Sequence, residues 1–526
     1  MSGFEIQGHS LIGAERGQPG GTTFHGVDPV TGGALSPPYH VASTAEVERA
    51  CELAAAAAPV IAALSGRERA AFLRAIADQM EAGRADFERL VPLETGLPQA
   101  RASGELGRTI GQLRAFAALV EEGSWVDARI DHADAARQPL PKPDVRSMLR
   151  PLGPVVVFGA SNFPLAFSVA GGDTASAFAA GCPVIVKAHP AHPATGERAA
   201  LAIRAAVKQC GLPEGTFSLL FDAGHDVGAA LVRHPAVRAV GFTGSTAGGR
   251  ALMDLAAARP DPIPVYAEMG SINPVFVLPH AATSRGTAIA QQLHGSVIQG
   301  CGQFCTSPGV ILAPMDASSN LRDQLQALFG QGSAAPMLTG PIANRYAEGV
   351  KEMASVPGVD LLAGGTAVER HAVPSLLQVE AARFRDEARL HEEVFGPSTL
   401  LVHTGDVDEM LSIAGSLDGQ LTATIFADPE DEAAAGRLLE VLSTVAGRVL
   451  MNGVPTGVEV CPAMVHGGPY PATSDGRTTS VGTAAIERFT RRVCYQNIPD
   501  SLLPESLRES NPLGLWRLVD GVRVKQ

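Results

Sequence analysis

Pro154-Val-Val-Val-Phe158 and Pro183-Val-Ile-Val-Lys187 are short, continuously apolar runs of the kind that form buried strands. Two further runs of this kind follow at 217–221 and 237–242. Stretches whose apolar residues have helical spacing lie between these four runs and after the last of them. They are found near 166–180, 194–209, 224–233 and 246–258. Strands that alternate with helices in this way predict a parallel sheet joined by crossover helices.

The pattern extends in both directions from this region. Upstream, Ser43-x-x-Glu46 and Ser65-x-x-Glu68 are capping boxes that predict helices near 43–63 and 66–81. Downstream, apolar runs at 274–278 and 310–313 flank a helical stretch near 283–299. We therefore predict an α/β protein with a second α/β layer after Pro264.

Two segments depart from the alternation. Residues 127–149 are polar and contain prolines between extended-looking stretches, which favours a protruding hairpin. Residues 491–526 show little periodicity of either kind, and we expect a tail or arm that packs on a partner.

Composition restricts the class of protein. The 526 residues are 45% hydrophobic and 18% charged, which predicts a globular fold of two or three domains. A formal net charge of -13 without a basic cluster argues against a nucleic-acid partner, and no apolar run reaches membrane-spanning length. No secretory signal is visible near Met1, and the seven cysteines are scattered, so we expect a cytoplasmic protein with a small-molecule substrate.

Cys305 is a candidate nucleophile. It stands in Gly302-Gln-Phe-Cys305, after a predicted helix that ends near Gln299, where backbone N–H groups favour a thiolate and a developing oxyanion. A small buried cysteine is the alternative. Cys301-x-x-x-Cys305 is also compatible with half of a zinc site, but no second Cys/His pair has ligand spacing, so we predict no metal.

Glu268 and Asn162 are the other candidate catalytic residues. Glu268 comes at a strand end directly before a glycine turn, where a carboxylate with a raised pKa acts as a general base. Asn162, in Ser161-Asn-Phe-Pro164, follows the first strand and can donate its amide to an oxyanion. A solvated strand-end glutamate and a turn residue before proline are the alternatives.

Together these stretches resemble the aldehyde dehydrogenase superfamily, from about Val41 to Pro499. The matching motifs, in the order of the family, are Asn162-Phe-Pro164, Glu268-Met-Gly270, Gly302-Gln-Phe-Cys305 and Val394-Phe-Gly-Pro397 preceded by Glu392-Glu393. The resemblance implies that Cys305 attacks the aldehyde while the Asn162 amide and the Cys305 N–H hold the oxyanion. It also implies that Glu268 deprotonates the water that hydrolyses the thioester.

The resemblance also implies a nicotinamide cofactor. The dinucleotide fingerprint G-x-G-x-x-G is missing, but Phe242-Thr-Gly-Ser245 opens a helix after a strand, where N–H groups suit a pyrophosphate. Pro190 stands where NAD-preferring members usually carry glutamate, so we predict NADP, with NAD possible. The predicted cofactor-binding residues are Lys187, Pro190, Gly244, Ser245, Gly249, Glu393 and Phe395.

Several departures from the common family pattern narrow the resemblance. Ser161 replaces a frequent tryptophan, and Gly270-Ser-Ile replaces Gly-Gly-Lys. With the stretches 187–193 and 461–471, these features look like the branch that contains 2-oxoglutarate semialdehyde (2,5-dioxopentanoate) dehydrogenases, with NADP-dependent fatty aldehyde dehydrogenases as the alternative. His189, His192 and His466 are interpreted as loop and cofactor-pocket residues.

The resemblance implies three parts. A cofactor domain covers 1–126 and 150–267, with a return of the chain near 456–486, and a catalytic domain covers 268–455. Residues 127–149 and 487–526 form an oligomerisation element, since the family makes at least dimers. A non-catalytic scaffold and a CoA-acylating dehydrogenase are rivals, but a scaffold would be expected to lose Cys305, Glu268 or Asn162, and retention of Glu268 argues against CoA.

Overall fold

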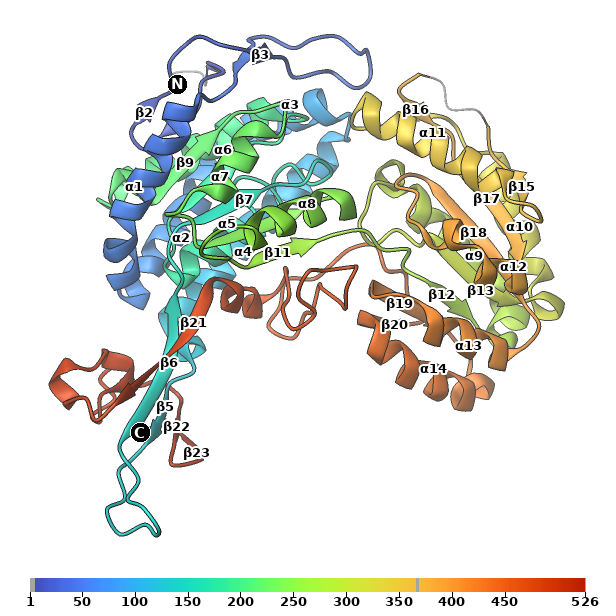
Figure 1. Ribbon diagram of the computed structural model, residues 1–526. Coiled ribbons are helices and arrows are strands. Elements are labelled where there is room, and N and C mark those ends of the chain that lie inside the picture. The colour runs from blue at the N-terminus through green and yellow to red at the C-terminus, as the bar shows by residue number, and fades with distance from the viewer. Residues whose placement is uncertain (1–4, 366–368, 526) are drawn as a thin grey trace.

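The computed structural model describes residues 5–365 and 369–525. Within these residues, two seven-stranded sheets form the body and a five-stranded sheet forms a projecting part, alongside two small two-stranded sheets (Figure 1). The small sheets pair β3 (Thr23–Phe24) with β4 (Tyr39–His40) and β14 (Ala335–Pro336) with β16 (His371–Ala372). The predicted α/β fold with two parallel-rich sheets and a small additional element is confirmed.

The first sheet has the strand order β11-β10-β7-β8-β9-β1-β2, and its five long strands are parallel. Its strands are β7 (Val155–Phe158), β8 (Val184–Lys187), β9 (Phe217–Leu220), β10 (Ala239–Thr243), β11 (Val265–Glu268), β1 (Leu11–Ile12) and β2 (Glu15–Arg16). The four strands predicted first are confirmed. Because β8 and β10 lie on opposite sides of β7, the loops after β7 and β10 diverge, and a ligand crevice is expected between them.

Helices cover both faces of this sheet. The predicted crossover helices are α6 (Pro193–Gln209), α7 (Asp226–Arg233) and α8 (Thr246–Ala257), and the helices before the sheet are α1 (Thr44–Ala63), α2 (Gly66–Ala82), α3 (Arg84–Thr95) and α4 (Gln99–Glu122). Both capping boxes are present, so the predicted starts of α1 and α2 are confirmed.

One predicted helix begins later than expected. The helix predicted near 166–180 is α5 (Gly172–Ala180), and residues 165–171 form a loop. The carboxylate of Glu105 accepts the backbone N–H groups of Leu165 and Ala166, both at 2.9 Å, so this turn is satisfied from another helix. The loop then closes tightly, because Gly172 N donates to Ala166 O at 3.0 Å.

The second sheet has the order β15-β17-β18-β13-β12-β19-β20, and only the edge strand β15 pairs in antiparallel fashion. Its strands are β12 (Val275–Val277), β13 (Val310–Pro314), β15 (Asp360–Ala363), β17 (Ser375–Glu380), β18 (Ser398–Thr404), β19 (Gln420–Phe426) and β20 (Ala446–Met451). Val275 and Val277 pack into one apolar cluster and Phe276 into another, so successive residues of β12 face opposite layers.

The helices of this second layer are α9 (Pro279–Ile298), α10 (Ser319–Gly330), α11 (Gly340–Ser355), α12 (Ala381–Asp386), α13 (Val407–Ser416) and α14 (Glu432–Val445). The predicted runs at 274–278 and 310–313 and the helix between them are confirmed, although α9 begins at Pro279. None of the helices in residues 5–365 and 369–525 is both long and apolar enough to cross a membrane.

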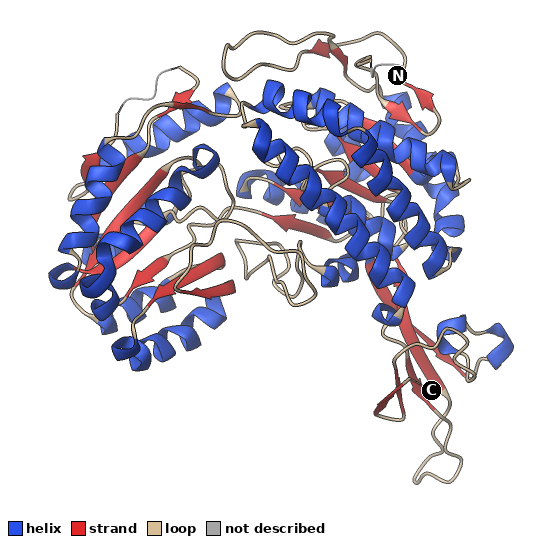
Figure 2. Cartoon of the chain, turned by 180° about the vertical axis from the view of Figure 1, so that it is seen from behind, coloured by secondary structure: helices blue, strands red, loops and turns tan. Residues whose placement is uncertain are grey.

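The five-stranded sheet projects from the body, with the C-terminus beside it (Figure 2). We call residues 129–151 and 490–524 the arm. Its strands are β5 (Arg129–Asp131), β6 (Val145–Pro151), β21 (Thr490–Gln496), β22 (Arg517–Val519) and β23 (Val522–Val524). The predicted hairpin is confirmed, because β5 and β6 are antiparallel.

The C-terminal segment was expected as a tail or arm that packs on a partner. It forms an arm, because β21 pairs with β6 and β22 pairs with β5 of the same chain, and packing on a partner stays a prediction. Six residues of β21 are exposed or half-buried on either face, so no period-2 pattern marks the strand in the sequence.

Candidate active site

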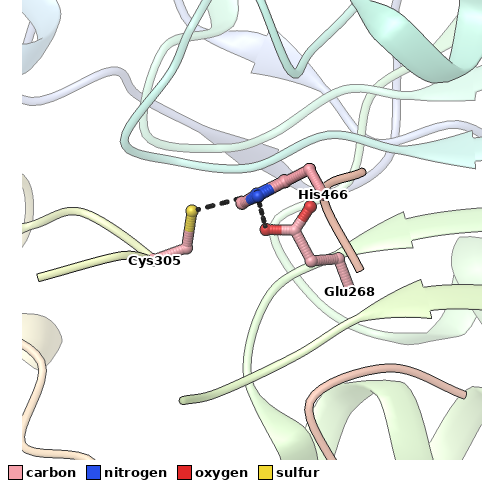
Figure 3. A group of neighbouring side chains, drawn as sticks. All are labelled: Glu268, Cys305 and His466. Atoms are coloured by element: carbon pink, nitrogen blue, oxygen red, sulfur yellow. Dashed lines mark hydrogen bonds and ion pairs between the residues drawn. The ribbon is translucent and has the colours of Figure 1, made fainter. Parts of the chain in front are cut away.

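Three side chains from distant parts of the chain meet at one point (Figure 3). Glu268 ends β11, Cys305 follows the short helix η3 (Gln299–Gly302), and His466 lies between β20 and η7 (Thr483–Phe489). Nε2 of His466 is 3.5 Å from Sγ of Cys305 and 2.9 Å from Oε1 of Glu268. The structure therefore brings the predicted nucleophile and the predicted base together, with an imidazole between them.

The loop that carries Cys305 is held from both sides. The amide of Asn273 donates to Cys305 O at 2.8 Å and to Ser307 O at 3.0 Å. On the other side, Gly302 has φ +66°, and a Cβ there would lie 2.2 Å from the carbonyl carbon of Gly396. Only glycine permits that approach, so the motif around Cys305 packs directly on the Val394-Phe-Gly-Pro397 motif.

Glu268 is buried, and each of its two carboxylate oxygens has a hydrogen-bond partner. Ser480 Oγ donates to its Oε2 at 2.7 Å, while His466 contacts Oε1. Burial pushes the pKa of Glu268 upward, but the charge of His466 and the hydrogen bonds from His466 and Ser480 outweigh burial and hold it below its usual value. The expectation of a raised pKa was wrong, because it considered burial without these two partners.

The thiol of Cys305 is a weak acid in this state of the enzyme. Burial, then the negative charge and hydrogen bonding of Glu268, and then the charge of Glu393 raise the pKa of Cys305 well above its ordinary value. The nucleophile is therefore protonated at neutral pH before substrate arrives. A neighbouring group that can take its proton is needed, and the hydrogen-bonded pair of Glu268 and His466 lies beside the sulfur, with His466 Nε2 3.5 Å from Sγ.

Asn162 lies in the loop after β7, in the crevice that the strand order predicts. Its Nδ2 donates to Gln303 O at 2.9 Å, two residues before Cys305. A large cavity begins here, and Asn162, Glu268 and Cys305 all contribute to its wall. Asn162 therefore shares one cavity wall with Cys305 and Glu268, and its role toward an oxyanion stays a prediction.

The same cavity extends across the crevice to α8 and the loop after β8. Of the residues predicted to bind cofactor, Pro190, Gly244, Ser245, Glu393 and Phe395 line it. Gly249 does not contribute to its described wall, and a Cβ there would meet Met269 Sδ at 2.6 Å, so this glycine serves the packing of α8 on the end of β11. Lys187, at the end of β8, also lies outside the described lining.

Comparison with known proteins assigns the chain to a family. The aldehyde dehydrogenase family model matches residues 17–492. The chain belongs to the aldehyde dehydrogenase family. It is similar to "Alpha-ketoglutaric semialdehyde dehydrogenase 2" of Azospirillum brasilense, with 53% identity over 98% of this chain and 99% of the relative. It is also similar to "Alpha-ketoglutaric semialdehyde dehydrogenase" of Acinetobacter baylyi, with 48% identity over 92% of each chain.

Solved structures show the same aldehyde dehydrogenase fold. PnpE from Pseudomonas sp. WBC-3 superposes with a TM-score of 0.79 at 22% identity and covers 96% of this chain and 100% of its own. The NADP-dependent glyceraldehyde-3-phosphate dehydrogenase of Bacillus halodurans C-125, complexed with NADP, gives a TM-score of 0.80 at 22% identity and covers 94% and 99%. As a member of this family, the protein is an NAD(P)-dependent oxidoreductase that converts an aldehyde to an acid.

The cavity suits the dinucleotide that an aldehyde dehydrogenase requires. Ser245 caps the 12-residue helix α8 through Gly248 N, and Gly244 and Ser245 line the cavity at the N-terminus of this helix, where N–H groups suit a pyrophosphate. Burial raises the pKa of Glu393 to about 8, and its carboxyl group can form hydrogen bonds with ribose hydroxyls; a Cβ at Gly270 would stand 2.6 Å from its Oε2. The donor set therefore fits a nicotinamide dinucleotide.

The three histidines separate into different roles in this aldehyde dehydrogenase. His189 lines the cavity, and His192 is buried with Nε2 2.9 Å from Ala160 O, which ties down the loop before Asn162. His466 was interpreted as a loop or cofactor-pocket residue, but it contacts the nucleophile and the base instead. It stands 161 residues from Cys305 and 198 from Glu268, so no spacing signal in the sequence could identify it.

Proposed function

We propose that the enzyme oxidises 2,5-dioxopentanoate, the semialdehyde of 2-oxoglutarate, to 2-oxoglutarate through a thioester on Cys305. The names and near-complete overlap of the two relatives support this substrate. The observation that supports the chemistry most is the contact of one imidazole with both Cys305 and Glu268, at a point where the cofactor cavity ends.

The first half of the proposed reaction forms the thioester. As Sγ of Cys305 bonds to the aldehyde carbon, the hydrogen-bonded pair of Glu268 and His466 takes up the thiol proton, and the amide of Asn162 with the N–H of Cys305 stabilises the oxyanion. A bound nicotinamide dinucleotide supplies the acceptor for the hydride that leaves the aldehyde carbon. Loss of that hydride leaves a thioester on Cys305.

The second half hydrolyses the thioester. Glu268 is ionised at neutral pH, because its pKa is held low, so it can take a proton from a water that attacks the thioester carbon. The carbon–sulfur bond breaks, the carboxylate product forms, and Cys305 recovers its proton. Ser480 holds the second oxygen of Glu268 and fixes the direction of the base.

We propose NADP as the preferred cofactor. Pro190 lines the cavity at a position where a glutamate would repel a 2′-phosphate, and Lys187 stands three residues before it. Burial lowers the pKa of Lys187, and the charge of Asp222 partly restores it. Asp222 also gives a specific reason for NAD as the second candidate, since a carboxylate near Lys187 opposes a phosphate.

We also propose that the arm is the oligomerisation element of at least a dimer. Its sheet projects from the body rather than completing either of the two large sheets (Figures 1 and 2). Gel filtration with light scattering of the full chain and of a chain that lacks 132–143, the tip of the hairpin, gives the test. If the mass and stability of the oligomer are unchanged without the tip, only the strands of the arm remain as the proposed oligomerisation element.

One panel of assays tests substrate and cofactor together. Steady-state kinetics with 2,5-dioxopentanoate, glutarate semialdehyde, succinate semialdehyde, pentanal and decanal are measured with NAD and with NADP. We expect the highest kcat/KM for 2,5-dioxopentanoate with NADP. A higher kcat/KM for decanal would identify a fatty aldehyde dehydrogenase, and an acyl-CoA product in the presence of CoA would identify the acylating class.

A further inference from the structure

A second cavity also reaches Cys305. Its wall is distinct from that of the cofactor cavity and combines the inner face of α4, the segment 457–466 and Arg448 of β20. His466 and Cys305 lie at its inner end, so a substrate held in this cavity can present its aldehyde carbon to the nucleophile. Charged side chains in such a passage decide which substrates enter it.

Two arginines of α4 lie on this wall, and one of them is already neutralised. Arg101 is 3.5 Å from Glu105, and its guanidinium lies over the rings of Phe163 and Phe304, at 4.3 and 4.9 Å from their centroids. Glu105 is itself buried, and its carboxylate accepts two backbone N–H groups from the loop after β7. Arg101 and Glu105 thus form a structural pair.

Arg108 lies one helical turn beyond Glu105, on the same face of α4. Its guanidinium lies over Phe167 at 5.0 Å, and its Nη2 reaches Val458 O at only 3.5 Å. Among residues 5–365 and 369–525, its buried Nη1 has no hydrogen-bond partner and the side chain has no ion pair within 4.0 Å. A buried guanidinium without an anionic partner is unfavourable in free energy, and binding of a ligand anion would reduce this penalty.

Arg448 approaches the cavity from the other sheet. Its Nη1 donates to Gly457 O at 2.9 Å and its Nη2 to Pro455 O at 2.5 Å, so neutral carbonyls hold the guanidinium in place. Within the described part of the chain, it also lacks a carboxylate within ion-pair distance, and its Nε is buried without a partner. The acidic side chain on the cavity wall that faces this region, Glu459, is exposed to solvent.

Both guanidiniums lie in the electrostatic neighbourhood of the nucleophile. Burial lowers the pKa of Arg108, and the charge of Glu105, together with that of Cys305 when its thiol is ionised, partly offsets this effect. Burial likewise lowers the pKa of Arg448, and Cys305 acts in the opposite direction when its thiol is ionised. Two cations therefore share one cavity with the sulfur, and among the described residues neither has a carboxylate within ion-pair distance.

We propose that Arg108 and Arg448 form the subsite that binds the far carboxylate of the substrate while its aldehyde carbon lies at Cys305. The ligand class is a short acid that carries an aldehyde at its other end. Such a molecule places an anion between the two guanidiniums, whereas an uncharged aldehyde leaves both cations uncompensated. This inference rests on the proposed function and assigns the residues that give it its substrate preference.

Glutamine variants of the two arginines test the subsite. Arg108→Gln and Arg448→Gln are compared with Arg114→Gln, a matched change on the same helix at an exposed arginine that pairs with Asp78 at 3.3 Å. The readout is the ratio of kcat/KM for 2,5-dioxopentanoate to kcat/KM for pentanal. We expect each subsite variant to lower this ratio by about 10- to 100-fold, the worth of a hydrogen-bonded charge pair, and Arg114→Gln to leave it within about twofold.

A second measurement does not depend on turnover or on variants. Glutarate is expected to slow the alkylation of Cys305 by iodoacetamide in the unmodified enzyme, whereas uncharged pentane-1,5-diol is not, and Arg108→Gln is expected to remove the difference. Equal protection by the two compounds, or an unchanged kinetic ratio in both folded variants, would overturn the subsite. If the unmodified enzyme itself prefers pentanal, the proposed substrate fails instead, and the two failures are thereby distinguished.

Discussion

Nε2 of His466 lies 2.9 Å from Oε1 of Glu268, and both side chains are buried. This contact opposes the effect of burial and keeps the pKa of Glu268 below its usual value. A base that must be ionised thereby remains ionised at neutral pH inside a site that would otherwise favour the protonated acid.

Replacing His466 with phenylalanine is expected to raise the pKa of Glu268, because burial is then opposed only by the hydrogen bonds with Ser480 and Cys305. More of the base is protonated at any given pH, so the acidic limb of the kcat profile moves to higher pH. His466→Gln can keep a hydrogen bond to Glu268 but carries no charge. The acidic limb of its kcat profile is therefore expected to lie between those of the unmodified enzyme and of the phenylalanine variant. Profiles from pH 5 to 9 give the measurement, with His25→Gln as control, and an unmoved limb would show that His466 does not set this pKa.

Cys305→Ala is expected to reduce turnover by on the order of 10⁴-fold or more, since the covalent bond can no longer form. Cofactor binding, measured by the fluorescence of the reduced dinucleotide, is expected to remain close to that of the unmodified enzyme. Cys301→Ala is the matched control: its Sγ contacts Ala335 O at 3.6 Å and burial raises its pKa to about 11. Substantial turnover by Cys305→Ala would remove Cys305 from the mechanism.

Glu268→Gln is expected to complete one hydride transfer and then to stall at the thioester, because an amide cannot accept the proton of water. Stopped-flow absorbance should show a burst of reduced cofactor without steady turnover, and mass spectrometry of quenched enzyme should find the acyl group on Cys305. Steady-state rates like those of the unmodified enzyme would assign the base to another residue.

The same variant changes the acidity of the thiol. Glu268 is one of the groups that raise the pKa of Cys305, through its charge and its hydrogen bond. Without that carboxylate the pKa falls, more thiolate is present at a given pH, and alkylation by iodoacetamide is expected to reach its plateau at lower pH. Rates measured as a function of pH in both proteins decide this, and a shift to higher pH would contradict the assigned sign.

Pro190→Glu is expected to shift the cofactor preference toward NAD, because the new carboxylate would face the 2′-phosphate of NADP in the cavity wall. The ratio of kcat/KM for the two cofactors should change by about tenfold or more, which corresponds to about 1.4 kcal/mol. A higher efficiency with NAD in the unmodified enzyme would instead favour the influence of Asp222.

The parts of the fold that the sequence predicts correctly are those with local signals. The apolar runs of β7 and β8 and the capping boxes of α1 and α2 each specify their element within a few residues. The late start of α5 depends on Glu105, which is 60 residues from Leu165, so no local pattern reports it.

The candidate site likewise contains some residues with local sequence signals and others without them. Asn162, Glu268 and Cys305 stand in motifs with strand-end or loop contexts, and the structure brings them to one cavity. His466 and the two cavity arginines lie in no such motif, and their roles arise from tertiary contacts across the two sheets. The low pKa of Glu268 was likewise invisible until its partners were known.

The arm also constrains how the chain is made. His132, directly after the hairpin strand β5, donates its backbone N–H to Oδ1 of Asp520, which is 388 residues away in the sequence. At about 5–20 residues per second, a ribosome finishes β22 roughly 20 to 80 s after β5 has been synthesised. During translation the strand edges of the nascent hairpin therefore remain unpaired until the C-terminal strands have been made. In a prematurely terminated chain these edges would stay unpaired, and this exposed backbone would differ from the finished enzyme in a way that proteases and chaperones can recognise.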